Sequence, residues 1–226
     1  MTENEYVRPD PEELLKRISA GERDEKKGRL TIFFGYAPGV GKTYSMLYDA
    51  ILRKKDEKLD VVVGYIEFHK RPETQEMAKS FEIISPLKIN YTGLELKEPN
   101  IAEIIKRKPN IVIIDELAHT NAKGMNHDKR YKDVDEILNS GIDVYTTLNV
   151  QHLESLKDIV QQITGTRANE NIPDPIFLLA DEVKVIDLPI EDLLRRLKDG
   201  KVYTKDMAEK AVQKFFRQGN LSPYGK

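Results

Sequence analysis

The sequence contains no cysteine among its 226 residues. Disulfide bonds, thiolate zinc sites and a cysteine nucleophile are therefore excluded, while the redox compartment stays open. Charge of one sign is also lacking, because 36 lysines and arginines nearly balance 38 aspartates and glutamates. The chain therefore has no strong overall field of the kind that favours binding to nucleic acid or to an anionic membrane surface.

Long hydrophobic runs are missing as well. No stretch approaches the roughly 18 consecutive apolar residues that would cross a bilayer, and residues 1–10 are too polar for the core of a signal peptide. We therefore expect a cytoplasmic chain that does not insert directly into a membrane. The hydrophobic share of 39% and the charged share of 33% are those of a globular domain with a substantial core.

What the sequence does contain is a regular alternation of short apolar runs and amphipathic segments. Strands are predicted where apolar residues run together, at 30–34, 61–66, 111–114, 143–147 and 183–186, with a weaker one at 88–91. Helices are predicted after residue 10, from 42 to about 53, from 72 to about 81, and at 101–105, 134–138, 153–163, 190–198 and 204–217. This alternation implies crossover connections and a mostly parallel sheet flanked by helices. We expect one α/β domain over residues 1–226, with the terminal helices packed on it.

The segment that carries the clearest chemistry joins the first predicted strand to a helix. Residues 35–43 read Gly-Tyr-Ala-Pro-Gly-Val-Gly-Lys-Thr. Gly39 and Gly41 allow the backbone to turn its amides toward an anion at the positive end of the helix. Lys42 is placed to reach the terminal phosphates of a nucleotide, and the Thr43 hydroxyl is placed to bind Mg2+.

One position departs from the usual phosphate-loop pattern. Tyr36 stands where the first glycine is expected, and Gly35 lies one residue too early. Because that glycine is the least involved in phosphate contact, the segment still predicts a P-loop, with a glycine-rich turn and an exposed lysine as the alternative. The expected nucleotide contacts in this loop are Pro38, Gly39, Val40, Gly41, Lys42, Thr43 and Tyr44.

An acidic pair at the end of the strand at 111–114 is the expected partner of this loop. Asp115 is placed to hold Mg2+ through water or together with Thr43. Glu116 is a candidate catalytic residue that would polarise an attacking water, or it only supports the loop. An acid directly after the magnesium aspartate is typical of P-loop proteins with a strand inserted between the two motif strands, which favours a RecA-like arrangement.

Other predicted strands also end in polar residues, and ligands of open parallel sheets bind beyond the carboxyl ends of the strands. Asn149 and Gln151 could sense a terminal phosphate by hydrogen bonding. Arg71, Arg130 and Arg167 are candidates for a charge-stabilising arginine, with ordinary surface salt bridges as the alternative. The four histidines fall in such loops, where each alone is expected to be solvated, and their spacing supports no metal site.

Several blocks of the sequence together resemble the N-terminal cytoplasmic domain of the KdpD family, the membrane sensor histidine kinases of bacterial potassium homeostasis. These blocks are the phosphate loop and the segments 8–11, 32–35, 61–64, 115–121, 141–147 and 149–156. The similarity runs from about residue 8 to about residue 221. It departs at 68–71, where Phe-His-Lys-Arg stands in place of the usual Thr-His-Gly-Arg.

The resemblance implies a domain that binds ATP with Mg2+ and regulates a two-component kinase. Through the kinase-to-phosphatase balance it would control expression of a potassium uptake system. The implied partners are the nucleotide and the other domains of a KdpD-type kinase, or a separate kinase protein, and a homodimer stays open. Membrane association is implied only through the larger kinase, whose kinase core is not expected in this chain.

Two other classes of function remain open from the residues alone. An autonomous ATPase or phosphotransferase is supported by Glu116 and by the polar strand ends, and it would turn ATP over faster than a regulatory domain. An interaction scaffold with a relic nucleotide site would show no binding of Mg2+-ATP. A nucleic-acid motor is not expected, because the near-neutral charge offers no basic track.

Overall fold

The computed structural model describes residues 27–68, 71–91, 93–165 and 167–199. The helices predicted after residue 10 and at 204–217 lie outside these ranges. Of the helices that the structure describes, none combines the length and the apolar character that a bilayer span requires.

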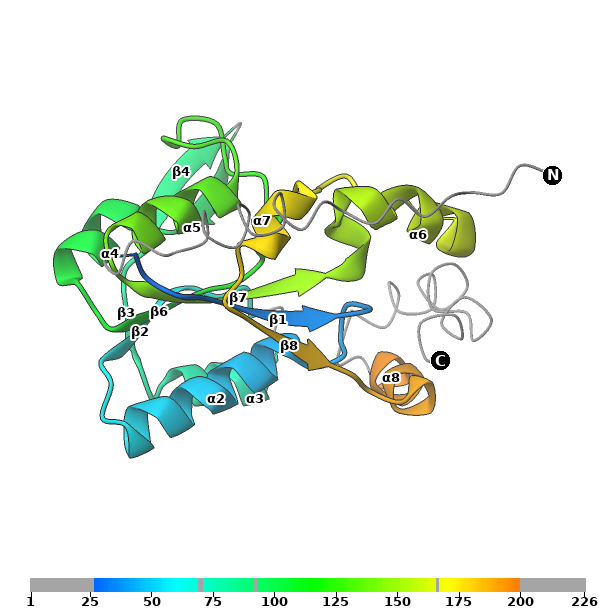
Figure 1. Ribbon diagram of the computed structural model, residues 1–226, viewed down its shortest axis with the longest axis horizontal. Helices are drawn as coiled ribbons and strands as arrows, with labels where there is room; N and C mark the ends of the chain where they lie inside the picture. Colours follow the sequence, from blue (N-terminus) through cyan, green and yellow to red (C-terminus); the bar gives the residue numbers. More distant parts are fainter. Residues whose placement is uncertain (1–26, 69–70, 92, 166, 200–226) are drawn as a thin grey trace, which may run out of the picture.

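A six-stranded parallel sheet forms the middle layer (Figure 1). Its strands lie in the order β3-β2-β6-β7-β1-β8, and every neighbouring pair is parallel. The strands are β1 Leu30–Gly35, β2 Val61–Tyr65, β3 Glu82–Ile83, β6 Ile111–Ile114, β7 Asp143–Asn149 and β8 Glu182–Ile186. The predicted mostly parallel α/β sheet is therefore confirmed.

Helices cover both faces of this sheet (Figure 1). On one face lie α4 Ile101–Arg107, α5 Arg130–Asn139, α6 Lys157–Thr164 and α7 Asp174–Leu178; on the other lie α2 Lys42–Asp56 and α3 Pro72–Ala78. Each face has its own hydrophobic core. The four residues of β6 are all buried, as expected for a strand between two helical layers.

The order of the central strands places the two predicted motifs at one edge of the sheet. β7 lies between β1, which leads into the glycine-rich loop, and β6, which leads into the acidic pair. The predicted insertion of a strand between the two motif strands is therefore confirmed. Because all three strands run parallel, their carboxyl ends lie together and bring the loop and the acids close to each other.

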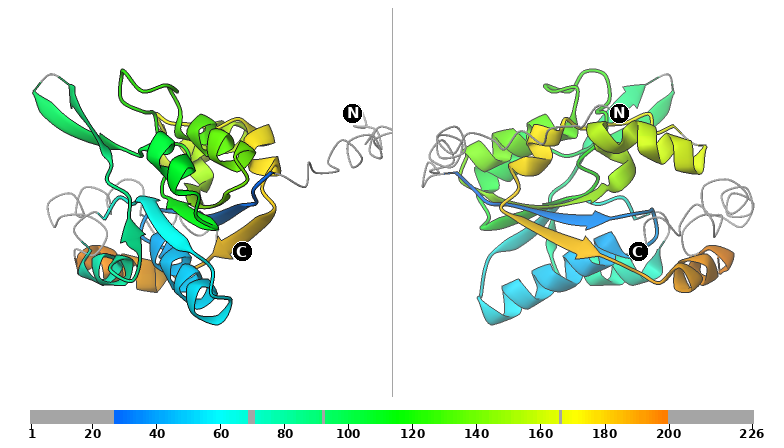
Figure 2. Two further views of the ribbon diagram at one scale, coloured as in Figure 1. Left: turned by 90° about the vertical axis from the view of Figure 1, so that its left-hand side faces the viewer. Right: turned by 45° about the vertical axis from the view of Figure 1, so that its right-hand side comes forward.

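Among the strands and α-helices, β3, β5 Leu94–Glu98 and α7 were not predicted from the sequence, whereas β4 Leu87–Tyr91 was predicted at 88–91. β4 pairs antiparallel with β5, and this hairpin projects from the body of the molecule (Figure 2). The residues of β5 alternate leucine with charged side chains and are mostly exposed, so they lack the apolar run that marked the other strands. α7 has only five residues and β3 only two, so neither is long enough for a periodic pattern to be recognised.

Two predicted helices have different ends in the structure. The helix expected at 153–163 is preceded by two short 3-10 turns, η1 Val150–His152 and η2 Glu154–Leu156, and its α-helical part begins at Lys157. The helix expected to reach about residue 81 ends at Ala78. The last described helix, α8 Ile190–Lys198, agrees with its prediction and lies beyond the carboxyl ends of β1 and β8 (Figure 1).

Candidate functional site

The loop between β1 and α2 has the backbone geometry that its glycines were predicted to allow. Gly39 and Gly41 have φ angles of 89° and 110°, in the region that L side chains rarely adopt. Gly41 is the N-cap of α2 and therefore offers no side chain to cap the first amides, and the first turn contains no acidic residue. The positive end of α2 is thus left without a negatively charged side chain of its own.

Lys42 is buried directly behind this loop, and its ammonium group donates a hydrogen bond to the Ala37 carbonyl oxygen at 3.1 Å. Burial lowers the pKa of Lys42 to about 8, and the nearby charge of Arg71 acts in the same direction. The carboxylates of Asp115 and Glu116 oppose this shift only in part. The site therefore contains a poorly solvated cation whose charged form an added anion would stabilise.

Asp115, directly after β6, is hydrogen-bonded to the start of α2 and to β7. One of its carboxylate oxygens accepts a hydrogen bond from the Thr43 hydroxyl at 3.2 Å, and the other accepts one from the Thr147 hydroxyl of β7. Burial, followed by the charge of Glu116, raises the pKa of Asp115. The structure thus brings together a hydroxyl and a carboxylate oxygen, the hard donors that Mg2+ prefers.

Glu116 adopts an unusual backbone conformation beside this pair. Its φ of 62° lies in the left-handed region, which for a residue other than glycine costs about 1–3 kcal/mol. Its amide donates hydrogen bonds to the Asp115 carboxylate at 3.1 Å and to the Thr147 hydroxyl at 3.2 Å. These bonds hold the strained turn and direct the chain from β6 toward the site.

A small polar cavity of about 60 Å³ lies next to Glu116. It is lined by Glu116, Ala118, His119, Thr147, Leu148, Asn149, His152 and Glu170. The side-chain oxygen of Asn149 is buried and has no hydrogen-bond partner within the described part of the chain. A cavity of this size and polarity can hold a water molecule, which would satisfy that oxygen.

The remaining predicted contacts lie around the same edge of the sheet. Asn149 is paired in register with Gly35, so it stands beside the start of the loop. Gln151 follows in η1 and is half-buried. Tyr44 is 48% exposed in the first turn of α2, while Val40 is buried against α8. Their contact with a nucleotide remains a prediction.

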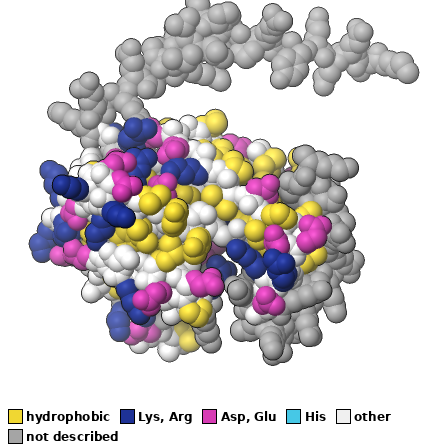
Figure 3. Space-filling view, turned by 90° about the horizontal axis from the view of Figure 1, so that it is seen from below, with side chains coloured by type: hydrophobic (Ala, Val, Ile, Leu, Met, Phe, Trp, Pro, Cys, Tyr) yellow, Lys and Arg dark blue, Asp and Glu magenta, His cyan; other side chains and the backbone are white. Residues whose placement is uncertain are grey.

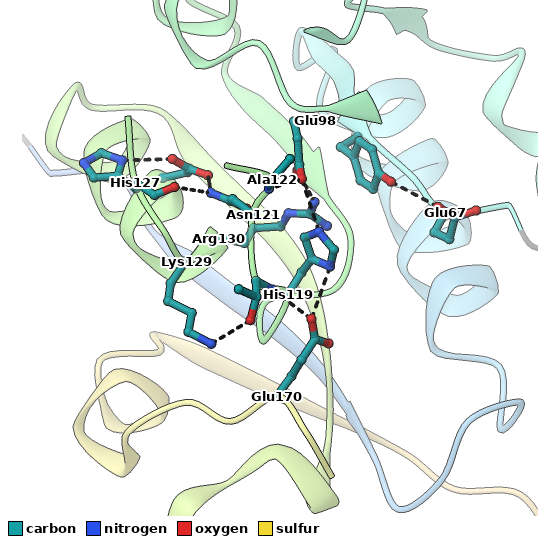
Figure 4. Close-up of polar contacts among 12 residues, drawn as sticks. Glu67, Glu98, His119, Asn121, Ala122, His127, Lys129, Arg130 and Glu170 are labelled. Carbon is teal, nitrogen blue, oxygen red and sulfur yellow. Dashed lines mark hydrogen bonds and ion pairs between the residues drawn. The ribbon is translucent and has the colours of Figure 1, made fainter. Parts of the chain in front are cut away.

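Arg130 does not have the position predicted for a charge-stabilising arginine. Its side chain is fully buried, and the guanidinium donates to the Glu98 carboxylate at 2.8 Å and to the Asp115 backbone oxygen at 3.1 Å (Figure 4). It also lies 4.3 Å from the centre of the Tyr65 ring. A guanidinium held by these contacts supports the end of β6 and cannot reach a ligand, so this prediction is wrong for Arg130.

The other two candidate arginines lie elsewhere. Arg71 is the N-cap of α3 and is close enough to Lys42 to lower its pKa. Arg167 is exposed. Of the three, Arg71 is therefore the one that lies near enough to Lys42 for its charge to act on the loop.

The described histidines are hydrogen-bonded, which corrects the expectation of solvated loop residues. Burial opposes protonation of His119, but hydrogen bonds to Glu170 and Glu98 raise its pKa to about 9 (Figure 4). His127 contacts the buried carboxylate of Asp133 at 2.9 Å. The ring of His152 is 2.8 Å from the backbone oxygen of Glu170. His69 lies outside the described residues.

Four residues of this region were missed by sequence reasoning. The Thr147 hydroxyl donates a hydrogen bond to Asp115, and Glu98 forms an ion pair with Arg130. Glu170 contacts His119, and Arg196 of α8 donates to the Gly39 backbone oxygen at 3.3 Å. Only Thr147 had a usable signal, its place at the end of a predicted strand. The others reach the site from segments that are distant in the sequence.

The face of the molecule on which α2 lies carries charges of both signs. On the side of the sheet that is covered by α2, Figure 3 shows Lys and Arg side chains mixed with Asp and Glu around a group of hydrophobic side chains. The described side chains on this face therefore form no continuous basic track, as a nucleic-acid-binding surface would require.

Comparison with known proteins gives a consistent result over nearly the whole chain. Residues 26–225 match the family described as KdpD: Osmosensitive K+ channel His kinase sensor domain. The Sensor protein KdpD of Clostridium acetobutylicum is 49% identical over 216 residues, and that of Escherichia coli K12 is 46% identical over 218 residues. The Putative sensor protein KdpD of a Synechocystis strain is 45% identical over 196 residues.

The share of each protein that is matched differs strongly. The first two alignments cover 96% of this chain but only 24% of the relative, and the Synechocystis alignment covers 87% of this chain and 53% of the relative. This chain therefore corresponds to one part of longer proteins. By both the family match and the identities, it belongs to the family of the KdpD osmosensitive K+ channel His kinase sensor domain.

Proposed function

We propose that the chain is a P-loop nucleotide-binding domain that binds Mg2+-ATP and regulates a KdpD-type two-component kinase. The observation that carries the proposal is the hydrogen bond of 3.2 Å between Thr43 and Asp115, next to the buried Lys42. Lys42 and Thr43 begin α2, whereas Asp115 follows β6. Their joint position beside the turn at Gly39 and Gly41 has a direct use in binding a polyphosphate and its metal ion.

Each part of the site would have a separate task. The amides of residues 39–43 and the Lys42 ammonium would bind the phosphates. The negative charge of the ligand would stabilise the Lys42 ammonium, which burial has left poorly solvated. The Thr43 hydroxyl and the Asp115 carboxylate would hold Mg2+, which neutralises phosphate charge when it is bound. The side-chain oxygen of Asn149 lies beside Glu116 and has no partner among the described residues. Asn149 and Gln151 would respond to the terminal phosphate through hydrogen-bonded water.

The regulatory role rests on the family. The relatives are named as sensor proteins, and the matched part is described as a sensor domain of an osmosensitive K+ channel His kinase. Arg130 is already committed to Glu98, so this arginine is not available to stabilise transferred charge. We therefore propose slow turnover or none, with the other domains of the kinase as partners and potassium uptake as the process that is controlled.

A second candidate function is an autonomous ATPase or phosphotransferase. The observation that favours it is the polar cavity beside Glu116, which has room for a water molecule close to a carboxylate. Steady-state hydrolysis by the purified protein separates the two candidates. Turnover of about 1 s⁻¹ or faster, typical of phosphoryl-transfer enzymes, that is abolished by Glu116→Gln would support the enzyme and reject the regulatory domain.

Calorimetric titration tests nucleotide binding itself. Wild-type protein should bind Mg2+-ATP, and Lys42→Ala should weaken binding at least tenfold, because hydrogen bonds to charged groups contribute about 1.5–3 kcal/mol. Lys55→Ala removes an exposed lysine near the other end of α2 and serves as the matched control, with affinity within twofold of wild type. Titrations with ADP and GTP report the preference for phosphate number and base. Failure of the wild type to bind any of these nucleotides would reject the proposal and favour a scaffold.

A further inference from the structure

Helix α8 packs directly on the glycine-rich loop. Leu193 and Leu197 of the helix form a small buried cluster with Ala37 and Val40 of the loop. All four side chains are at most 3% exposed. The contact extends to the segment before the helix, where the Tyr36 hydroxyl donates to the backbone oxygen of Leu188 at 2.6 Å. The outer side of the loop is thus held by a helix that lies about 150 residues further along the chain.

One polar side chain of this helix reaches the turn of the loop. A terminal nitrogen of Arg196 donates to the Gly39 backbone oxygen at 3.3 Å. The same nitrogen would lie 3.4 Å from a Cβ atom built on Gly41. The guanidinium therefore lies against the two glycines of the loop that have positive φ angles, in the segment whose amides are the proposed phosphate ligands.

The partners of Arg196 leave most of its bonding capacity unused. Within the described residues no carboxylate pairs with it, and a guanidinium has five N–H donors, of which the Gly39 carbonyl uses one. Arg195, the next residue of the helix, is different: it is 73% exposed and paired with Asp192 at 2.6 Å. Arg196 is only half-buried, so its donors remain accessible to a ligand at the loop.

We propose that Arg196 is a phosphate-binding residue that α8 contributes to the nucleotide site. The proposal rests on the proposed function, since it requires a polyphosphate at the loop. A guanidinium suits this task because it offers several donors in a planar fork that matches phosphate oxygens. Its contact with a bound phosphate would add to the apolar contacts of Leu193 and Leu197. Nucleotide binding would therefore fix α8 more firmly on the loop.

Three variants test the contribution to affinity. We expect Arg196→Gln to weaken Mg2+-ATP binding by tenfold or more in calorimetry, the effect of losing a charged hydrogen bond. Arg195→Gln, the matched control on the neighbouring position, should stay within twofold of wild type. Lys42→Ala gives the reference for a damaged loop. Thermal unfolding without nucleotide should give the same Tm for Arg196→Gln and wild type, because the substituted side chain can still donate to the Gly39 carbonyl.

The dependence on salt separates a phosphate contact from a purely structural role. Loss of an ion pair with phosphate should make the slope of log Kd against log salt concentration shallower for Arg196→Gln than for wild type. Hydrogen exchange gives a second readout: Mg2+-ATP should protect the amides of 190–198 in the wild type and Arg195→Gln but not in Arg196→Gln.

Each outcome bears on one of the two proposals. If the wild type binds no nucleotide, the proposed function itself is rejected. If the wild type binds and Arg196→Gln binds equally well, the nucleotide site stands and the role of Arg196 is rejected. A weaker Arg196→Gln variant with an unchanged salt slope and unchanged protection of α8 would also reject it, because Arg196 would then only shape the loop.

Discussion

At the scale of single residues, Lys42 is the group whose ionisation a ligand is best placed to change. Burial lowers its pKa to about 8, although the carboxylates of Asp115 and Glu116 favour its charged form. A polyphosphate at the loop would add several negative charges and raise this pKa again. The free and the bound protein should therefore carry different numbers of protons near pH 8.

This difference can be measured as proton uptake. At pH 8 about half of the free Lys42 is neutral, while the phosphates of ATP are already ionised because their highest pKa is about 6. We expect about half a proton to be taken up per Mg2+-ATP bound at pH 8, almost none from Lys42 at pH 6.5, and weaker binding as the pH rises above 8. Calorimetry in buffers with different ionisation enthalpies gives the proton number directly.

Lys42→Arg is the control for this measurement. An arginine stays charged at all these pH values, so the uptake should disappear even if some affinity is kept. Equal uptake in wild type and Lys42→Arg would assign the proton to another group and contradict the role given to Lys42.

At the scale of elements, the β4–β5 hairpin is connected to α5 through a buried ion pair. Glu98, the last residue of β5, is 2% exposed and accepts from Arg130 at the start of α5 and from the Ala122 amide. Burial acts to raise the pKa of Glu98, but the hydrogen bonds with His119, Ala122 and Arg130 together lower it. Because Arg130 also donates to the backbone oxygen of Asp115, the pair supports the end of β6 as well.

Breaking this pair should therefore destabilise the fold more than breaking a surface pair. Arg130→Met leaves the Glu98 carboxylate with fewer partners, and the expected loss in the free energy of unfolding is about 3–5 kcal/mol. Lys106→Met, which removes the exposed pair with Glu103, should cost less than about 1 kcal/mol. Urea unfolding followed by circular dichroism measures both.

The double variant Glu98→Gln/Arg130→Met isolates the charge effect. It should recover part of the stability lost in Arg130→Met, because no unpaired carboxylate is left in the interior. Equal stabilities of Arg130→Met and Lys106→Met would contradict a structural role for Arg130.

At the scale of the whole molecule, the sequence was sufficient to predict five of the six strands of the central sheet, all but β3, and to place the glycine-rich loop and the acidic pair at one edge of it. Strands such as β6 are covered on both faces, so their residues are uniformly apolar and easy to recognise. Gly39 and Gly41 predicted a turn with positive φ angles, which the structure has. Asp115 and Glu116 could be placed at the same edge of the sheet as this turn, because the carboxyl ends of parallel strands lie together.

What could not be predicted depends on contacts between distant segments. The hairpin strand β5 is exposed on most of its length and has no apolar run, so Glu98 at its end could not be recognised as a buried group. Without Glu98, Arg130 remained a candidate for the site. The same limit applies to Arg196, because its contact with Gly39 follows only from the packing of α8 on the loop.

A crystal structure with Mg2+ and a non-hydrolysable ATP analogue is the most direct test of nucleotide binding at the glycine-rich loop. We expect the β- and γ-phosphates to lie against the amides of residues 39–43 and the Lys42 ammonium, with Mg2+ bound by Thr43 and next to Asp115. Density for the analogue at another place, with the space inside the loop empty or blocked by side chains, would contradict this expectation.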